Sequence, residues 1–260
     1  MMLDEPYRWA EAVANRREYI EDQLRGGSPV VGLGYRDGAL LLTLGQGQQK
    51  IFEVYDRIGM AALGHPADIE KLRQSAVDLA SVIGFNYSEQ DVNLQQIVHF
   101  GLGPAVKTAF DEVFRSPFIV RVLMLELDVS EEGAVFYTVD YDGTFHKHEG
   151  RGVLGDIPEA DGLMRSRLPD NTGRLSLRNA LKAALEAWAV GRFVGTLDEI
   201  PRETSELERV ADEADLQAIL KDALESATVE AVVLDRSDTD KRRFRVLGNR
   251  DIQPVTRPYR

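Results

Sequence analysis

A long apolar run in the middle of the chain is the feature that most limits what this sequence can fold into. Residues 118–127 read Phe-Ile-Val-Arg-Val-Leu-Met-Leu-Glu-Leu, so apolar side chains occupy both alternating positions of an extended strand. Such a strand has to be covered on both faces, because exposing either face would leave a row of apolar side chains in water. We therefore expect this strand to lie inside a layered domain.

Shorter alternating runs on either side of this strand predict antiparallel strands with tight turns. Before it, four strands are expected to form one meander, at residues 30–35, 39–44, 50–55 and 59–63. After it, strands are expected at residues 134–139, 144–148, 229–234 and 243–247.

Segments with a 3.6-residue apolar period predict the helices. They are expected at residues 5–25, 67–84, 91–115, 158–168, 176–190 and 216–223. Gly84 stands where a helix C-cap belongs, and Asp91 stands where an N-cap belongs. Gly101 and Gly103 are expected to bend or divide the helix that contains them.

The order of these elements indicates the architecture. An N-terminal helix is followed by a strand meander, a helix pair, a second meander, a second helix pair and two closing strands. Two sheets packed face to face between two helical layers satisfy this order. The predicted fold is α+β, a four-layer α-β-β-α sandwich.

The composition excludes several classes of function. The chain has no cysteine and four histidines, which excludes thiolate chemistry and leaves little for a metal site. Its net charge of −12 disfavours binding to nucleic acid or to an anionic membrane. No segment has the pattern of a membrane span or a signal peptide, so we expect a cytoplasmic protein with no cofactor and no metal.

Charge is distributed unevenly toward the C-terminus. Residues 198–240 contain fourteen acidic and four basic residues, and residues 241–260 contain seven basic residues and one acidic residue. Two interpretations stay open. One is an acidic arm and a basic tail that contact other subunits, and the other is a solvated acidic helix and a frayed terminus.

Two smaller patterns suggest chemistry only superficially. His146 and His148 alternate along a predicted strand and would face the same side, but no third metal ligand accompanies them. Solvent-facing histidines are the simpler interpretation. Gly32-Leu-Gly and Gly45-Gln-Gly lack the remainder of a phosphate-binding loop, and we interpret them as strand and turn glycines.

Several segments carry a family resemblance through their order and spacing. The N-terminal helix runs into Gly-Gly-Ser-Pro-Val-Val-Gly-Leu-Gly-Tyr, followed by Gln-Gln-Lys-Ile-Phe-Glu-Val-Tyr-Asp-Arg-Ile-Gly, then Ala-Ala-Leu-Gly, and later Tyr-Asp-Gly. Together they resemble the α-type subunits of the 20S proteasome, and most closely the bacterial α subunit. The resemblance covers nearly the whole chain and implies the N-terminal-nucleophile hydrolase fold, which is an α-β-β-α sandwich.

Catalytic β-type relatives of this fold begin with a threonine that is freed by cleavage after a glycine, and its own amine acts as the base. Gly27-Ser28 matches that place, so a self-processing hydrolase that uses Ser28 is one alternative. Against it, Pro29 follows directly, Thr43-Leu-Gly stands where catalytic relatives carry an acid, and a helix precedes. We expect no catalytic residue. A non-proteasomal scaffold of the same fold is the other alternative.

The resemblance implies a non-catalytic subunit in protein degradation. Such subunits form a homo-heptameric α ring on catalytic proteasome β subunits, bind a ring ATPase activator by its C-terminal tails, and admit unfolded protein substrate in transit. The gate residues would be Met1, Met2, Leu3, Asp4 and Glu5. The first helix would pack between neighbouring subunits, with packing on its own domain as the alternative.

The same resemblance divides the chain into three parts. Residues 1–27 would be the gate segment and first helix. Residues 28–250 would be the sandwich domain, with an acidic helical insertion at about residues 198–226. Residues 251–260 would be a C-terminal tail.

Lys50 is the residue that the resemblance marks most strongly as a binding site. The matching lysine lies in a pocket between adjacent α subunits and pairs with the terminal carboxylate of an activator tail. Gly27 and Gly64 match positions that line this pocket, where a side chain would obstruct the tail, and Glu18 matches a further position. An ammonium at the start of a strand, beside backbone amides, suits the capture of one carboxylate. An exposed lysine at a strand edge is the alternative interpretation.

Overall fold

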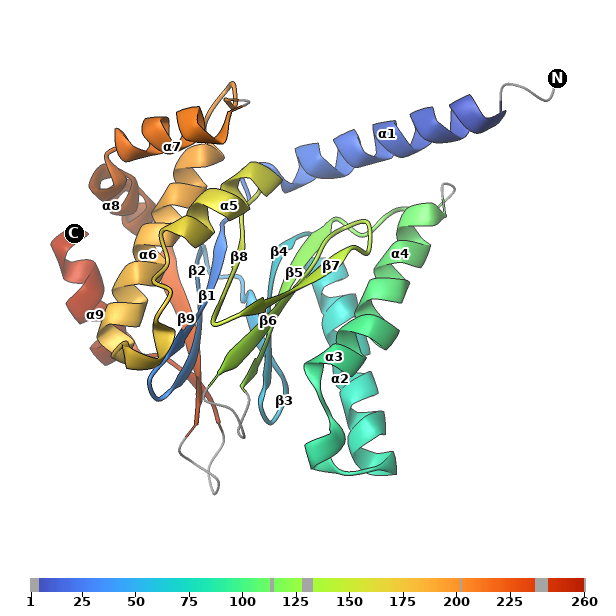
Figure 1. Cartoon of the computed structure of the whole chain (residues 1–260), viewed down its shortest axis with the longest axis horizontal. Helices are drawn as coiled ribbons and strands as arrows, with labels where there is room; N and C mark the ends of the chain where they lie inside the picture. Colours follow the sequence, from blue (N-terminus) through green and yellow to red (C-terminus); the bar gives the residue numbers. More distant parts are fainter. Residues whose placement is uncertain (1–4, 113–114, 128–132, 202, 237–242, 260) are drawn as a thin grey trace.

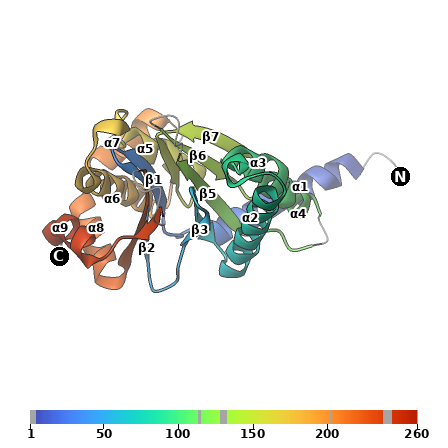
Figure 2. The ribbon, with the colours of Figure 1, turned by 90° about the horizontal axis from the view of Figure 1, so that it is seen from below.

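The computed structural model of the chain describes residues 5–112, 115–127, 133–201, 203–236 and 243–259. Two five-stranded antiparallel sheets lie face to face, and helices cover the outer face of each sheet (Figures 1 and 2). The predicted four-layer α-β-β-α sandwich is confirmed.

The two sheets take their strands from separate parts of the chain. The first has the order β10-β9-β2-β1-β8, and its strands are β1 (Val30–Tyr35), β2 (Gly38–Gly45), β8 (Arg151–Leu154), β9 (Thr228–Asp235) and β10 (Phe244–Val246). The second has the order β3-β4-β5-β6-β7, and its strands are β3 (Ile51–Tyr55), β4 (Ile58–Gly64), β5 (Val120–Leu127), β6 (Ala134–Val139) and β7 (Phe145–Glu149).

The predicted four-stranded meander is therefore wrong. β2 pairs along its whole length with β9, from Gly38 opposite Asp235 to Gly45 opposite Thr228, so it has no free edge for β3. The chain crosses to the second sheet after β2, and β3 pairs with β4 there. The pairing of β2 with β9, almost two hundred residues later in the chain, therefore places the β3–β4 hairpin in the second sheet.

The helices form two layers and one projecting element. α2 (Pro66–Asn86), α3 (Leu94–Gln96), a π-helical segment (Ile97–Leu102) and α4 (Gly103–Asp111) cover the second sheet. α5 (Pro158–Ser166), α6 (Leu177–Val194), α7 (Thr204–Asp212), α8 (Leu216–Ser226) and α9 (Asn249–Thr256) cover the first. α1 (Glu5–Leu24) leaves the sandwich at one end, and its N-terminal half extends away from the body (Figure 1).

The long apolar strand lies in the middle of the second sheet, as its composition requires. Side chains of β5 at residues 123, 125 and 127 belong to the core between the two sheets, and those at residues 120, 122 and 124 belong to the core under α2 and α4. β5 is thus covered on both faces, which confirms the prediction.

Glycines in the first sheet let the two sheets come close. The ring of Phe136 lies between them, fully buried, and a Cβ on Gly32 would stand 2.4 Å from that ring. A Cβ on Gly152 of β8 would stand 2.8 Å from the Phe136 side chain. The Gly32-Leu-Gly pattern is therefore a strand feature.

Two predicted helix ends differ from the structure. α2 continues through Gly84, which faces the Tyr55 hydroxyl, and a Cβ there would lie 2.3 Å from that oxygen. Gly84 permits close approach of a strand side chain and does not end the helix. Asn93, and not Asp91, caps the next helix, because its side chain accepts a hydrogen bond of 2.9 Å from the Gln96 amide. The expected division of that helix is confirmed by the π-helical segment that precedes Gly103.

The elements expected from apolar periods did not include β8, α7 or α9, although α7 lies within the acidic helical insertion expected at about residues 198–226. β8 is only four residues long, and it is fixed by its pairing with β1. α9 excludes the frayed terminus, one of the two interpretations of the basic tail, since Val255 and Thr256 are buried and Tyr259 packs against the same core. The tail forms a helix because its apolar side chains pack against α6 and its neighbours. The local sequence does not reveal this contact.

Candidate functional site

Lys50 lies at the junction between the two sheets, just before β3. Glu230 of β9 fixes this junction, because its carboxylate accepts hydrogen bonds from the Lys50 amide (3.0 and 3.1 Å) and the Ile51 amide (2.8 Å). The backbone amides that we expected beside an incoming carboxylate are thus already occupied by Glu230. Only the ammonium of Lys50 is left to attract an external anion.

The electrostatics of Lys50 and Glu230 reflect partial burial. Burial lowers the pKa of Lys50, and the nearby Glu230 carboxylate opposes this change. Burial also raises the pKa of Glu230, and its bonds to the two amides oppose that change. Among the described residues Lys50 forms no ion pair. A cation that has lost part of its hydration and has no carboxylate in direct contact attracts an incoming carboxylate more strongly than a fully solvated one.

A cavity of about 360 Å³ brings three of the four predicted site residues together. Lys50, Gly27 and Gly64 all line it, along with the C-terminal end of α1 and the start of α2. Glu18 does not join them, since it is exposed on α1 and lines neither cavity that borders Lys50.

The two glycines are required by the fold of this chain itself. Gly64 has a φ of +133°, and a Cβ on it would lie 2.1 Å from the Ile119 carbonyl oxygen. A Cβ on Gly27 would lie 2.9 Å from the Leu24 carbonyl oxygen and 2.9 Å from the Leu63 side chain. The expected reason, that side chains there would obstruct a bound tail, is not what these contacts indicate.

Asp156 and Arg192 hold the joint between α1 and β1. The Gly26 amide donates to Asp156 Oδ2 at 2.9 Å, and Arg192 Nη1 donates to the Gly26 carbonyl at 3.1 Å. Asp156 is only 4% exposed, and burial raises the pKa of its carboxyl group. Sequence reasoning missed this residue, and no local pattern could have found it, because its partner lies 130 positions earlier in the chain.

Ser28 lies beside the same joint, and its hydroxyl group is hydrogen-bonded to neighbouring side chains. Trp188 Nε1 donates to Ser28 Oγ at 3.1 Å, and Thr43 Oγ1 lies 3.3 Å from it. Thr43 Oγ1 in turn donates to the Pro29 carbonyl at 2.7 Å, so the Ser28 hydroxyl donates to Thr43. Among the described residues no acid or base bonds to Ser28. These bonds tie the start of β1 to β2 and α6.

The expected gate residues fall mostly outside the described chain. Met1, Met2, Leu3 and Asp4 lie there, and Glu5 is described only as the first residue of α1. The prediction about these residues therefore stays a prediction.

α1 packs on its own domain along the part from Val13 to Leu24. Ile20 and Leu24 are fully or almost fully buried, and Val13 packs beside them. Trp9 is 52% exposed on the half that extends from the body. The part of α1 from Val13 to Leu24 is thus packed on this chain, while the preceding part presents an uncovered aromatic side chain, and its contact with a neighbouring subunit stays a prediction.

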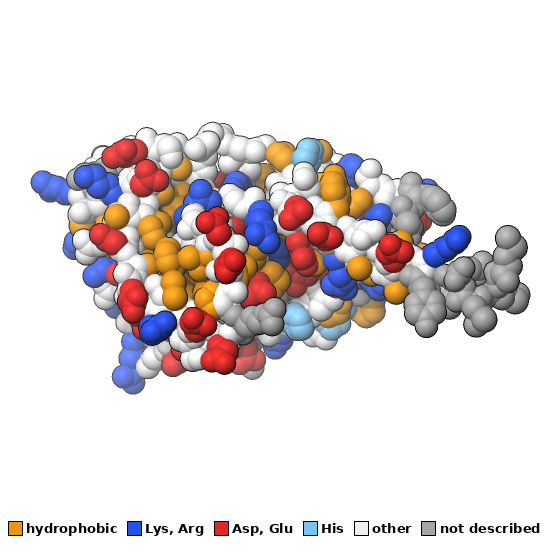
Figure 3. Space-filling view, turned by 90° about the horizontal axis from the view of Figure 1, so that it is seen from above, with side chains coloured by type: hydrophobic (Ala, Val, Ile, Leu, Met, Phe, Trp, Pro, Cys, Tyr) orange, Lys and Arg blue, Asp and Glu red, His pale blue; other side chains and the backbone are white. Residues whose placement is uncertain are grey.

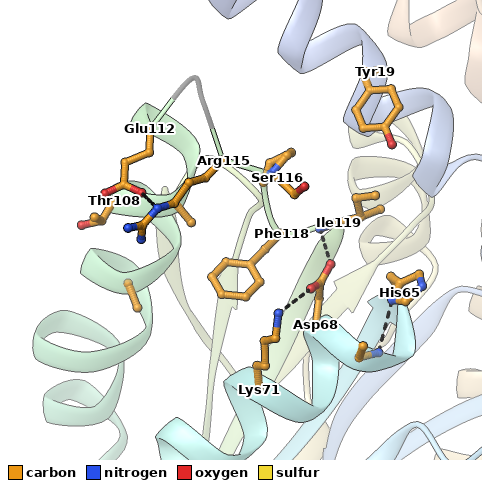
Figure 4. Close-up of a pocket in the computed structure, with 14 residues that line it drawn as sticks. Tyr19, His65, Asp68, Lys71, Thr108, Glu112, Arg115, Ser116, Phe118 and Ile119 are labelled. Atoms are coloured by element: carbon orange, nitrogen blue, oxygen red, sulfur yellow. Dashed lines mark hydrogen bonds and ion pairs between the residues drawn. The ribbon is translucent and has the colours of Figure 1, made fainter.

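A further cavity of about 690 Å³ lies between α1, α2 and α4 (Figure 4). Asp68 accepts a hydrogen bond of 3.0 Å from the Ile119 amide and lies 3.9 Å from Lys71 Nζ. Glu112 pairs with Arg115 at 3.0 Å. The described charges of this cavity therefore satisfy one another, and the arrangement is that of a structural cleft.

The histidine pair on β7 does not form a described metal site. The rings of His146 and His148 have centroids 6.5 Å apart, and within the described residues no group of three metal ligands exists. His148 is half-buried, with Nε2 3.2 Å from Thr138 Oγ1, so only His146 faces solvent as expected.

The face from which α1 emerges carries mixed charge. Acidic and basic side chains alternate over it, and apolar side chains gather between them in the left part of the view (Figure 3). In the ranges that the structure describes, no helix has the length and apolar character to cross a membrane.

Comparison with known proteins gives one family. The sequence model of the family described as "Proteasome subunit" matches residues 24–192. The chain is also similar to proteins named proteasome subunit alpha. The one from Streptomyces scabiei is 27% identical over 245 residues, which cover 93% of this chain and 87% of the relative. The one from Salinispora tropica is 28% identical over 249 residues, covering 89% of this chain and 94% of the relative.

Proposed function

Because this chain belongs to the proteasome subunit family, we propose that it is a non-catalytic α subunit that gates substrate entry and docks the C-terminal tails of a ring ATPase. Seven copies would form a ring on catalytic β subunits in the cytoplasm, and unfolded protein would pass through its pore. Similarity to bacterial α subunits along most of the chain supports the α assignment. No nucleic acid or membrane is involved in this function, in keeping with a net charge of −12.

The non-catalytic role is supported by the surroundings of Ser28. In catalytic relatives the base is the nucleophile's own amine, whereas here the Ser28 nitrogen belongs to the peptide that joins α1 to β1, and Ser28 Oγ is hydrogen-bonded to an indole N–H and a threonine hydroxyl. Intact mass measurement separates the alternatives: a full-length chain agrees with the proposal, whereas loss of residues 1–27 would establish the self-processing hydrolase.

The observation that carries the docking proposal is the position of Lys50. Its ammonium is half-buried, forms no ion pair with the described residues, and borders a cavity that Gly27 and Gly64 also line. A terminal carboxylate that enters this cavity gains a charge-assisted contact in a partly desolvated place. Glu18 is proposed to complete the pocket from a neighbouring subunit, since in its own chain it lies outside.

The docking proposal is tested by Lys50→Ala in the assembled particle. We expect ATPase-dependent degradation of folded substrates to fall strongly, while hydrolysis of short peptides by the particle alone stays unchanged. Lys147→Ala, at an exposed lysine of β7, is the matched control and should leave both rates unchanged. Normal ATPase-dependent degradation by Lys50→Ala would refute the docking role.

The gate proposal rests on the direction of α1, whose N-terminal half extends away from the body. In a ring, seven such segments would converge near the axis. Deletion of residues 2–8 should speed peptide hydrolysis by the assembled particle, and an unchanged rate would remove this part of the proposal.

A further inference from the structure

A second and larger groove borders Lys50. Its volume is about 730 Å³, and it shares Gly26, Gly27 and Lys50 with the smaller cavity. This volume lies in the range of cavities that bind peptides and small ligands, about 300–1,000 Å³. The two cavities therefore form one continuous depression, with the Lys50 ammonium at the point where they meet.

α8 forms the outer wall of this groove. Asp215 caps the helix by accepting hydrogen bonds from the amides of residues 217 and 218 (3.1 and 3.0 Å), and Leu220 and Leu224 anchor it in the core. Ile219 and Asp222, which are three residues apart and so lie on one face of α8, line the groove. The acidic segment that the sequence left without a role thus builds one side of a cavity next to Lys50.

The two sides of the groove carry opposite charges. Lys50 and Arg192 lie on the side of the sheets and α6, while Asp222 lies on α8. Ser226, the last residue of α8, also lines the groove, so the negative end of the helix dipole faces it. An extended peptide with its terminal carboxylate at Lys50 would therefore meet a negative wall a few residues upstream.

We propose that α8 forms a specificity subsite for the segment just upstream of the terminal residues of an activator tail, and that this subsite favours basic over acidic side chains. The inference rests on the proposed docking function. Lys50 alone would bind any terminal carboxylate, whereas the subsite would discriminate between tails of different sequence. The tail is the occupant because the groove shares Gly26, Gly27 and Lys50 with the smaller cavity and is the larger of the two, so it offers room for the residues upstream of the terminal carboxylate.

The experiment compares two synthetic decapeptides by fluorescence anisotropy with the assembled ring at about 0.15 M salt, where long-range charge effects are screened. Both end in Ala-Ala-Leu with a free carboxylate, and they carry either lysines or glutamates at the three preceding positions. We expect the lysine peptide to bind about threefold more tightly, the scale of one partly exposed ion pair. Asp222→Lys should reverse the order of the two affinities, and Asp222→Ala should bring them close together.

Glu225→Lys is the matched control, because it makes the same change of charge on the same helix at an exposed residue that does not line the groove. It should keep the preference for the lysine peptide. Equal shifts in Asp222→Lys and Glu225→Lys, or no shift in either, would overturn the subsite while leaving docking intact. Lys50→Ala should weaken both peptides equally. If Lys50→Ala bound both as tightly as the parent, or if the parent bound neither, the docking proposal itself would fail and the subsite with it.

Discussion

Arg121 is a buried cation on the face of β5 that otherwise forms the core between the sheets. It is 3% exposed, and its guanidinium group bonds to Asp140 (2.6 Å), Asp161 (2.6 Å) and the Gly155 carbonyl (2.8 Å). Burial alone lowers the pKa of Arg121, but Asp161 and Asp140 outweigh it and the net change is upward. This network joins β5 to α5, so one charged group links the sheet to the opposite helical layer.

Removing one charge from this network should be costly. Asp161→Asn leaves the buried guanidinium undercompensated, and we expect the free energy of unfolding to fall by about 3–5 kcal/mol. Asp170→Asn is the matched control, because Asp170 pairs with Arg151 but is 89% exposed. There we expect a loss of about 1 kcal/mol at most. Denaturant unfolding measures both, and similar losses would show that burial of Arg121 is unimportant.

His148 should make stability depend on pH. Burial, Arg165 and His146 lower the pKa of His148 from 6.5 to about 4, although Asp140 opposes them. In the folded chain this histidine stays neutral, while in the unfolded chain it takes up a proton near pH 6.5. Its contribution to stability is therefore complete above pH 6.5 and is lost as the pH falls toward 4.

We expect His148→Asn to remove this contribution. The melting temperature of the parent should fall more than that of the variant between pH 7 and pH 4.5. His146→Asn, on the same strand but exposed, is the control: it removes only the smaller effect of His146 on the pKa of His148, so its melting temperature should fall nearly as much as that of the parent. Parallel melting curves for the parent and His148→Asn across this range would contradict the assignment.

At the scale of elements, the turn between β6 and β7 anchors α1. The Tyr141 hydroxyl donates a hydrogen bond to Glu21, and Asp142 pairs with Arg17 at 2.9 Å. Gly143 has a φ of +82°, which a glycine adopts without strain, and its Cα lies against α4. The Tyr-Asp-Gly motif thus holds the C-terminal half of α1 against the sandwich.

Loss of the Tyr141 hydroxyl should loosen α1 without unfolding the sandwich. A hydrogen bond to a charged group contributes about 1.5–3 kcal/mol, so Tyr141→Phe should speed amide hydrogen exchange in the C-terminal half of α1 about tenfold or more. Exchange in β5 should not change. Tyr19→Phe, whose ring is 52% exposed on α1, is the control. If exchange in α1 were the same in the parent and in Tyr141→Phe, the anchoring role would be refuted.

At the scale of the whole molecule, several uncovered apolar side chains gather on the helical layer over the second sheet. Phe85 is 91% exposed, Tyr87 77%, Phe100 78% and Val82 54%. They lie at the end of α2 and on the π-helical segment that packs beside it. Exposed groups of this kind are typical of surfaces that become covered in an assembly.

Native mass spectrometry with co-expressed β subunits should show whether assembly of the particle depends on these exposed side chains. We expect the double variant Phe85→Ser, Phe100→Ser to remain folded and to enter the large particle less than the parent does, because burying two aromatic rings contributes several kcal/mol. Val246→Ser, at an isolated side chain that is 65% exposed on β10, should assemble normally. Unimpaired assembly of the double variant would exclude this surface as an interface.

Local sequence patterns determined most elements of this protein. A strand or helix is stabilised by side chains two, three or four residues apart, so β5, α2 and α6 were visible as apolar periods, and the sandwich followed from their order. Lys50 was marked by the resemblance of the segment around it to the proteasome family, and its role in docking stays a proposal.

The tertiary structure alone decided what depends on distant partners. β2 pairs with β9, the amides of Lys50 and Ile51 bond to Glu230, and the Gly26 amide bonds to Asp156, each across more than one hundred residues. Such contacts depend on the packing of whole layers and leave no periodic trace in the chain. For the same reason the role of α8 as a wall beside Lys50 appeared only when the sheets and helices were assembled.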